Sequence, residues 1–425
     1  MNNRVVITGL GVVSPNGVGI ADFRDAIKNG VSGIRYEAEL AALQFSCCIA
    51  GRPPVSEDQQ KQYFDELELK QLKSSGIIYG VIAGMQAWAD AQLPLPTADA
   101  PDWDSGTIFG AGTSGVDKFR EAIYKVDDLQ VRRLGSTAVT QTMASGISAF
   151  LGGKLGLGNQ VTTNSSACTT GAESVLLAYE RIKYGHAKRI LAGSTSESGP
   201  YIWGGFDAMK VSTFKHNATP AAGSRPLSAS ASGIVPGSGA GALLLESLDS
   251  ALARNAPIYA EVLGGHINSG GQRNGGSMTA PNPDAVQRCI SAALQQAGVR
   301  GADIDLINGH LTATGKDAEE VHNWSVALGR GGKDFPYLNA LKSMVGHCLS
   351  ASGSIELVAV ALQLKEGFVC PNINCEDLHP EVAAMVDTER IPQQLLYKDL
   401  QLAAKASFGF GDVNACIILK KYGQS

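Results

Sequence analysis

Cys168 is the residue of this chain whose setting best suits nucleophilic chemistry. It lies in V-T-T-N-S-S-A-C-T-T-G (161–171), where apolar and β-branched residues lead into a polar turn, and a run with helical spacing of apolar residues follows over 172–185. This order predicts a thiol between a strand and the start of a helix, where free backbone N–H groups and the helix dipole would lower the pKa of Cys168. A small buried side chain at a crowded junction fits the segment equally well.

Two histidines supply the other groups that cysteine catalysis needs, a proton carrier and a donor to an oxyanion. His310 lies in I-N-G-H-L-T-A-T-G, just after an expected strand at 305–308, and His347 lies in L-K-S-M-V-G-H-C-L-S-A-S-G, just before an expected helix. As neutral imidazoles, both could direct an N–H at a developing negative charge. Each histidine alone fits a structural role, but three such placements together favour one pocket that contains Cys168.

An internal repeat indicates how the chain brings these residues together. Gly171 to Gly185 and Gly353 to Gly367 are both helical stretches bounded by glycines fourteen positions apart, and each follows a polar turn. In this register Ser350 occupies the place of Cys168. We therefore predict an α/β protein of two similar halves, residues 1–250 with the nucleophile and 251–425 with the histidines, in which helices are sandwiched between sheets.

The N-terminal strand, R-V-V-I-T-G-L-G at 4–11, is almost entirely apolar, as expected for a strand buried on both faces of a sheet. Its glycines match part of a dinucleotide-binding loop, but the third glycine is missing and Pro15-Asn16-Gly17 forms a turn instead, which argues against nucleotide binding. Further along, the apolar spacing predicts one long helix over 67–92.

The composition disfavours several classes of function. Charged residues make up only 18% of the 425 residues and hydrophobic residues 44%, which predicts a large core or a subunit interface. A net charge of −5 argues against nonspecific binding to nucleic acid or to anionic membranes. Because the sequence has no apolar run of membrane-spanning length and no signal-peptide pattern, we expect a cytoplasmic protein. The eight cysteines form no C-x-x-C pair, so neither a metal site nor a disulfide framework is predicted.

Four motifs, in order along the chain, resemble those of the β-ketoacyl synthases of the thiolase superfamily, of the type that elongates acyl chains on acyl carrier protein. They are V-V-I-T-G-L-G-V-V-S-P-N-G at 5–17, S-A-C-T-T-G at 166–171, K-S-M-V-G-H at 342–347 and S-F-G-F-G at 407–411. The resemblance runs nearly end to end. It implies a thiolase-like, duplicated α-β-α-β-α sandwich of five layers and two pseudo-symmetric halves.

The resemblance also implies roles for individual residues. The family's catalytic Cys-His-His set matches Cys168, His310 and His347. The other roles that it implies are an active-site lysine, Lys342; a gating phenylalanine, Phe410; threonines that contact phosphopantetheine, Thr279, Thr312 and Thr314; and supporting acidic residues, Asp317 and Glu320. Lys210 matches a basic position used for carrier-protein contact, and further candidates for that contact are Lys70, Lys73, Arg132 and Arg133.

The implied reaction has two stages and needs no metal, redox group or other cofactor. Cys168 takes an acyl group from a carrier thioester, with the backbone N–H groups of Cys168 and Phe410 as the oxyanion hole. A malonyl-carrier thioester then loses carbon dioxide, His310 and His347 stabilise the enolate, and the carbanion attacks the acyl-cysteine. The implied partners are acyl carrier protein and a second copy of the chain in a homodimer, with no nucleic acid and no membrane.

Three departures from the family pattern bear on the pathway. Leu311 stands where the family has glycine, the acidic and basic residues after Ser224-Arg225-Pro226 are absent, and G-F-G-G-T-N becomes G-F-G-D-V-N with Asp412. They favour a specialised pathway, such as one for a polyene or an aromatic pigment, over ordinary fatty-acid synthesis.

Three alternatives to a homodimeric ketosynthase stay open at this point. The nearest is a ketosynthase active only as a heterodimer with a chain-length-factor-like homologue. A degradative thiolase is less favoured, because S-F-G-F-G replaces that family's second cysteine near the C-terminus. A non-catalytic partner subunit is less favoured because such a subunit normally lacks the nucleophile that this chain keeps at Cys168.

Overall fold

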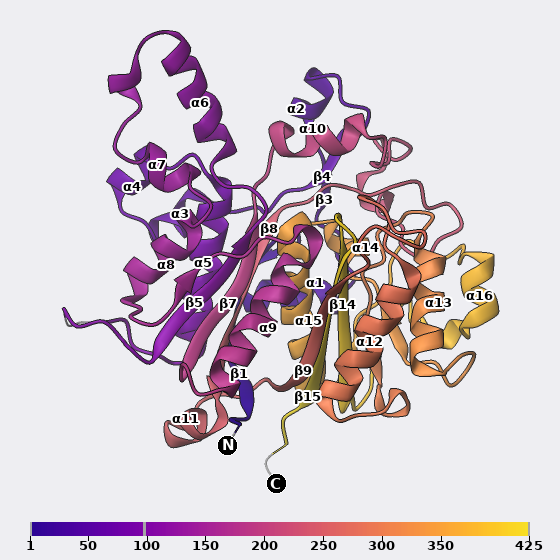
Figure 1. The fold of residues 1–425 in the computed structure, drawn as a ribbon. Coiled ribbons are helices and arrows are strands. Elements are labelled where there is room, and N and C mark those ends of the chain that lie inside the picture. The colour runs from indigo at the N-terminus through magenta and orange to yellow at the C-terminus, as the bar shows by residue number, and fades with distance from the viewer. Residues whose placement is uncertain (1, 97–98, 424–425) are drawn as a thin grey trace.

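The computed structural model describes residues 2–96 and 99–423, and its centre is a sheet of eleven strands (Figure 1). The first part of the chain contributes β1 (Val5–Ser14), β2 (Gly17–Val18), β5 (Ser105–Ala111), β6 (Val161–Thr162), β7 (Arg189–Ser196) and β8 (Gly239–Ser247). The second part contributes β9 (Ala260–Ser269), β10 (Leu306–Asn308), β11 (Tyr337–Asn339), β14 (Leu402–Gly409) and β15 (Val413–Lys421).

The strand order repeats, which supports the duplication predicted from the glycine spacing. From the centre outward the first half runs β1-β8-β7-β5-β6 and the second runs β9-β15-β14-β10-β11. In both halves the first two pairings are antiparallel and the last two are parallel. The halves join where residues 5–7 of β1 pair antiparallel with residues 260–262 of β9. The boundary predicted after residue 250 falls within α11 (Leu248–Ala253), just before this second set of strands.

Two long helices form the middle layer, α9 (Thr170–Lys183) and α15 (Ser352–Glu366), and they contact each other between the two half-sheets (Figure 1). They cross at the glycines that define the repeat. A Cβ added to Gly171 would lie 2.4 Å from the backbone nitrogen of Ser354, and one added to Gly353 would lie 2.7 Å from that of Ala172. Glycine is therefore required at both positions for the helices to approach this closely.

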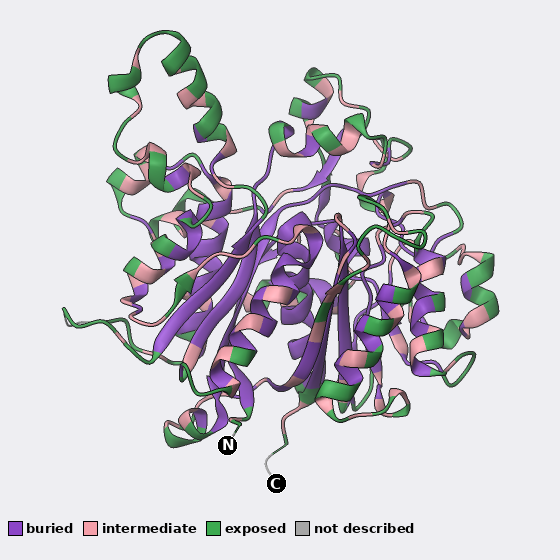
Figure 2. Ribbon diagram, viewed as in Figure 1, coloured by how far each residue is buried: buried purple, intermediate pink, exposed green. Residues whose placement is uncertain are grey.

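The outer layers complete the predicted five-layered α-β-α-β-α sandwich. Helices α5 (Ser75–Asp90) and α8 (Gly146–Leu155) pack on the first half-sheet, and α12 (Pro283–Ala297), followed by α13 (Asp317–Leu328), packs on the second. The glycines of β1 serve this packing, since a Cβ on Gly11 would lie 1.9 Å from the carbonyl oxygen of Ala83 in α5. Figure 2 shows that the sheet and the middle helices are buried along most of their length.

The remaining elements lie around this sandwich. The helices are α1 (Ile20–Lys28), α2 (Ala38–Ala42), α3 (Glu57–Lys61), α4 (Glu66–Gln71), α6 (Val116–Asp127), α7 (Ala138–Thr142), α10 (Pro200–Ala208), α14 (Lys342–Val345) and α16 (Pro380–Met385). Short strands pair as β3 (Ile34–Tyr36) with β4 (Ile49–Gly51) and β12 (Phe368–Val369) with β13 (Leu396–Tyr397). Within the ranges that the structure describes, no helix combines the length and apolarity needed to cross a membrane.

The single helix predicted over 67–92 is wrong, because the structure has two helices there, α4 and α5. The backbone turns extended at Leu72, and the Ser74 hydroxyl then caps the next helix by accepting a hydrogen bond from the backbone N–H of Ile77 at 3.2 Å. Serine is a favoured N-cap, because its hydroxyl satisfies one of the free N–H groups at the helix start. The apolar spacing continued across this break and concealed it.

Candidate active site

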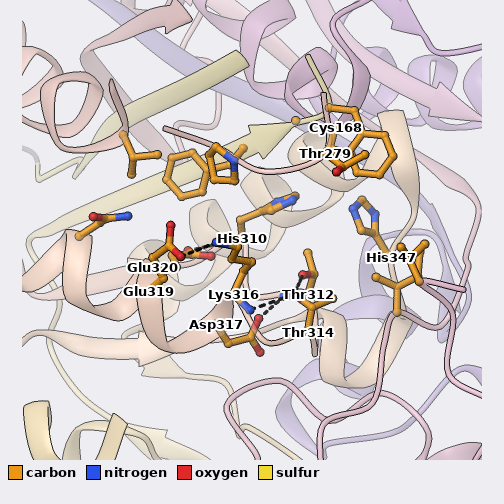
Figure 3. Close-up of a pocket in the computed structure, with 18 of the residues that line it drawn as sticks. Cys168, Thr279, His310, Thr312, Thr314, Lys316, Asp317, Glu319, Glu320 and His347 are labelled. Carbon is orange, nitrogen blue, oxygen red and sulfur yellow. Dashed lines mark hydrogen bonds and ion pairs between the residues drawn. The ribbon is translucent and has the colours of Figure 1, made fainter. Parts of the chain in front are cut away.

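Cys168, His310 and His347 lie in one pocket, together with Phe410 and the three threonines predicted to contact phosphopantetheine, Thr279, Thr312 and Thr314 (Figure 3). The Cys168 sulfur and one ring nitrogen of each histidine lie within 4.8 Å of one another, and all three side chains are buried. The pocket therefore joins a thiol from the first half of the chain to two imidazoles from the second.

Cys168 is placed by a short 3-10 turn, η2 (Ala167–Thr169), directly before α9. The same turn recurs in the second half as η5 (Leu349–Ala351) before α15, with Ser350 in the position of Cys168. Ala167 and Leu349, the first residues of the two turns, both have a φ of 50°. The match predicted between Cys168 and Ser350 thus extends to an uncommon backbone conformation.

The prediction that the helix start lowers the pKa of Cys168 is wrong for this structure. Burial raises the pKa of the thiol to about 11, and the nearby Lys342 charge and the backbone N–H groups of Phe410 and Cys168 offset this only in part. The reason is desolvation, which disfavours a thiolate in a closed apolar pocket more strongly than the local dipoles favour it. The two N–H groups that act on the sulfur are the pair expected to form the oxyanion hole.

His347 is held in one tautomer by the backbone that follows it. The backbone N–H of Leu349 donates to His347 Nδ1 at 3.0 Å, and the Ser352 hydroxyl lies 3.2 Å from the same nitrogen. Since Nδ1 accepts from an N–H, the ring proton of the neutral imidazole is on Nε2. Burial and the Lys342 and Lys405 charges hold the pKa of His347 well below its usual value, so the ring is neutral and can donate from Nε2.

His310 stands at the carboxyl end of β10, on a loop fixed by two buried acids. Its ring meets that of His347 edge to face, with centroids 5.3 Å apart, and that of Phe408 in a similar way at 6.0 Å. Burial, together with the Lys342 charge, holds the pKa of His310 well below its usual value. Both imidazoles are therefore neutral near pH 7.

The acidic residues predicted to support this loop do so through its backbone. Glu320 accepts from the N–H groups of His310 at 2.6 Å and Leu311 at 2.7 Å, and Asp317 accepts from those of Thr312 at 2.9 Å and Ala313 at 3.1 Å. Burial raises the pKa of Asp317 to about 6 and that of Glu320 to about 7. The two carboxyl groups thus replace the hydrogen bonds that a regular element would have supplied to residues 310–313.

Phe410 and Thr279 are brought together by Asp412, one of the departures noted in the sequence. Asp412 is buried with a φ of 61°, and its carboxylate accepts from the backbone N–H groups of Gln272 at 2.9 Å and Asn282 at 2.8 Å. The backbone N–H of Gly411 donates to the carbonyl of Met278 at 2.8 Å. Asp412 therefore ties the loop of Phe410 to residues 270–282, the loop that carries Thr279.

Lys342 lies behind the histidines, in a buried cluster of three charged side chains. Lys342 Nζ is 2.5 Å from Glu356 Oε1, and Lys405 Nζ is 2.8 Å from Glu356 Oε2. All three side chains are at most 2% exposed. Lys342 was expected from the sequence, whereas Glu356 and Lys405 were not. A lone lysine in the buried strand L-A-A-K-A-S was a usable signal for Lys405, because a buried lysine needs a partner.

The residues predicted to contact a carrier protein are all exposed. Lys210 directly follows Met209 and α10, and its neighbours Phe206 and Val211 line the pocket. Lys316, which was not among the residues expected from the sequence, also lines the pocket, and its ammonium group pairs with Glu319 at 2.6 Å. Lys70, Lys73, Arg132 and Arg133 line no part of this pocket.

The side chains of Cys168, His310 and His347 are also of the types that bind metal ions. A thiolate and two imidazoles suit zinc, and the three atoms here are close enough to share an ion. Burial is the main cause of the lowered pKa values of both rings, and the positive field of Lys342 and Lys405 behind the histidines lowers them further. This field disfavours a cation and favours an anion between the three side chains.

Comparison with known proteins is consistent with this geometry. Residues 2–251 match the family model described as "Beta-ketoacyl synthase, N-terminal domain", and residues 259–376 match that described as "Beta-ketoacyl synthase, C-terminal domain". A relative from Rhizobium meliloti named 3-oxoacyl-acyl-carrier-protein synthase 2 is 32% identical over 429 residues, which covers 99% of each chain.

Two similar solved structures are multi-protein assemblies. One is a type II PKS acyl-carrier protein in complex with its ketosynthase bound to the hexaketide, with a TM-score of 0.88 and 28% identity over 99% of this chain and 100% of that one. The other is the ishigamide ketosynthase/chain length factor, with a TM-score of 0.87 and 28% identity over the full length of both chains.

Proposed function

The chain belongs to the β-ketoacyl synthase family, and we propose that Cys168 carries an acyl group that is extended by two carbons from a malonyl thioester of acyl carrier protein. The enzyme is a 3-oxoacyl-acyl-carrier-protein synthase, an acyltransferase that catalyses a decarboxylative Claisen condensation. The observation that carries the assignment of residues is the 4.8 Å cluster of the Cys168 sulfur and the two neutral imidazoles.

In the first stage the Cys168 sulfur attacks the carbonyl carbon of an acyl thioester on the carrier. The oxygen of the tetrahedral intermediate accepts from the backbone N–H groups of Cys168 and Phe410, both of which act on the sulfur in the resting pocket. The carrier leaves as a thiol, with the proton that the Cys168 thiol gives up in the first turnover, or with a proton from solvent when Cys168 starts as the thiolate that condensation leaves. The acyl group is then bound to Cys168 as a thioester.

In the second stage a malonyl thioester loses carbon dioxide, and the electron pair of the broken C–C bond forms an enolate. The Nε2 proton of His347 is available to the enolate oxygen, because Leu349 holds Nδ1 as an acceptor. His310 supplies the second neutral donor. The enolate carbon then attacks the acyl-cysteine, and Cys168 leaves as a thiolate.

Intact-protein mass spectrometry and a carbon dioxide assay test the assignment. Incubation with acyl-carrier thioesters should add one acyl group, and peptide mapping should find it on Cys168. The Cys168→Ala variant should form no adduct but should still release carbon dioxide from the malonyl carrier, whereas His347→Ala should lose most of that release. An adduct on another cysteine would refute the role of Cys168.

We propose that the working form is a dimer. The arm formed by α6 and α7 projects from the sandwich (Figure 1), and several of its large apolar side chains are exposed, namely Phe119, Ile123, Tyr124, Leu129 and Val139. In addition, β6 is a sheet edge of two residues on which Val161 is exposed. Uncovered apolar surface and an open sheet edge are both typical of a subunit interface.

The similarity to a ketosynthase/chain length factor keeps the heterodimer as a second candidate. Size-exclusion chromatography with light scattering, combined with an elongation assay on the chain expressed alone, separates the two. An active homodimer would exclude a requirement for a homologous partner. An inactive chain that gains activity with a chain-length-factor-like homologue would support the heterodimer.

We further propose that acyl carrier protein docks at the pocket mouth near Lys210, and that the threonines 279, 312 and 314 receive its phosphopantetheine arm. In support, all three threonines line the pocket, and Lys210 is exposed and lies in the chain between Phe206 and Val211, which also line it. No cofactor other than this carried arm enters the proposed steps. The departures at Leu311 and Asp412 favour a specialised polyene or polyketide pathway within the broader fatty-acid or polyketide assignment.

A further inference from the structure

The buried cluster of Lys342, Glu356 and Lys405 contains two basic groups and one acid. Lys405 is fully buried on β14, and Glu356 is 1% exposed on α15. Each carboxylate oxygen of Glu356 is taken by a different lysine, at 2.5 Å from Lys342 and 2.8 Å from Lys405. One carboxylate therefore balances one ammonium group, and the second ammonium group has no anion of its own within the cluster.

The contacts of Lys405 distinguish it from Lys342. Its ammonium group donates to the carbonyl of Ala406 and to the Ser407 hydroxyl at 2.9 Å, and it faces Glu356 as an ion pair. Lys405 has no place in the lining of the pocket. Lys405 can therefore affect the reacting groups only through its contact with Glu356 or through the electrostatic field of its own charge.

We propose that Lys405 is a positioning residue for the reaction assigned above: it balances Glu356, so that the charge of Lys342 stays uncompensated and acts on the anions formed at Cys168 and the two histidines. Without Lys405, Glu356 would cancel Lys342 and the cluster would be neutral. The catalytic role of Lys405 rests on the proposed function. Its effect on the charge at Cys168, in contrast, is a property of the protein without substrate.

The surroundings of Lys405 contain the groups that such a charge would affect. The charged or titratable side chains that face the cluster from neighbouring elements are Glu320 of α13, Cys416 of β15, Cys168 of η2, Cys348 just before η5, and His310 and His347 in the pocket. Lys405 contributes to the low pKa of both histidines, and Glu356 raises that of Cys168 whereas Lys342 lowers it. These directions match a field that disfavours cations and favours anions in the pocket.

The test measures the charge at Cys168 without any acyl substrate. Alkylation of the purified protein by iodoacetamide is followed as a function of pH, with the Cys168 adduct quantified by peptide mass spectrometry. Lys405→Met should slow this alkylation about tenfold at a given pH, or shift its profile about one pH unit upward, because one unit charge is lost nearby. Circular dichroism and unfolding temperature show whether the variant is folded.

Two more variants separate charge from structure. Lys405→Met combined with Glu356→Gln removes one charge of each sign and leaves Lys342 uncompensated, so alkylation should return toward the wild-type rate. Glu356→Gln alone should shift the profile to lower pH, and it provides the test if Lys405→Met does not fold. A double variant slower than Lys405→Met, or a Glu356→Gln profile unchanged or shifted upward, would overturn the proposal.

The same variants are assayed for carbon dioxide release from a malonyl carrier, where Lys405→Met should lose about tenfold and the double variant should recover. If the wild-type protein releases no carbon dioxide, the proposed function fails, while the alkylation profiles still decide the role of Lys405. If release is normal in the wild type but the profiles do not respond to Lys405, the role of Lys405 fails and the function stands.

Discussion

Replacing Asp412 with glycine should loosen the loop that carries Thr279. The change removes two hydrogen bonds to a carboxylate, a partly buried one from the backbone N–H of Gln272 and a buried one from that of Asn282. Bonds to a charged acceptor contribute about 1.5–3 kcal/mol each. Glycine relieves the left-handed backbone of Asp412 by about 1 kcal/mol. The balance is a loss of about 2–5 kcal/mol in the free energy of opening residues 270–282, since the losses exceed the gain.

Hydrogen–deuterium exchange with mass spectrometry measures this opening directly. A loss of about 2 kcal/mol corresponds to about 30-fold faster exchange in peptides from the 270–282 loop, because each 1.4 kcal/mol is a factor of ten. Peptides from α9 and α15 should be unaffected. The KM for the malonyl carrier should rise, since Thr279 would lose its fixed position beside Phe410.

Two further variants check the reasoning. Asp412→Asn keeps a side chain that tolerates this conformation and keeps one acceptor oxygen, so its exchange should lie between wild type and glycine. Asn255→Gly, at an exposed residue with a φ of 52°, relieves a similar backbone without removing a buried acceptor and should slow local opening slightly. Unchanged or slower exchange of the 270–282 loop in Asp412→Gly would refute the account.

Three other predictions concern Gly171, Glu320 and Lys210. Gly171→Ala should lower the unfolding temperature by several degrees, because the added Cβ would lie 2.4 Å from the Ser354 backbone nitrogen. Differential scanning calorimetry measures the unfolding temperature, and a value equal to that of the wild type would contradict the close approach of the two helices. Burial raises the pKa of Glu320 to about 7, above its unfolded value, so its contribution to stability is full below about pH 4.5 and is lost as the pH rises to about 7. The unfolding temperature of Glu320→Gln, measured from pH 5 to pH 8, should therefore fall less than that of the wild type, and an equal fall would contradict this. Lys210→Glu should raise the KM for a carrier-bound substrate several-fold with little change in kcat. Lys333→Glu, at an exposed residue before β11 and away from the pocket, should leave this KM unchanged. Steady-state kinetics at low salt measure both variants, and equal effects on KM would contradict the docking proposal.

The sequence predicted the structure best at positions where only one type of residue is physically possible. Gly171 and Gly353 revealed the duplication because two helices can cross that closely only where neither has a Cβ. The same spacing correctly paired Cys168 with Ser350. The five-layered fold and the identity of the three pocket residues could therefore be predicted before any coordinates were known, with the family resemblance supplying the layer order.

Features that depend on contacts between distant parts of the chain could not be predicted from the sequence. The lowered pKa predicted for Cys168 took account of the helix start alone and left out the desolvation imposed by pocket walls that come mostly from the second half. Glu356 and Lys405 are 49 positions apart, and their pairing depends on how α15 packs against β14. The break between α4 and α5 depends on two extended residues, Leu72 and Ser74, inside a continuing apolar pattern.

The raised pKa of Cys168 is compatible with catalysis because the proposed reaction moves one negative charge through the pocket without creating a second. The malonyl carboxylate brings the charge in, decarboxylation transfers it to the enolate oxygen, and condensation leaves it on the Cys168 sulfur as the acyl group departs. Neutral histidines suit every step, since a protonated ring would bind the carboxylate as tightly as the enolate and so gain nothing in the transition state. An uncompensated Lys342 stabilises the charge at each position. Turnover thus returns Cys168 as a thiolate, the form that a buried thiol near pKa 11 would rarely supply on its own at pH 7.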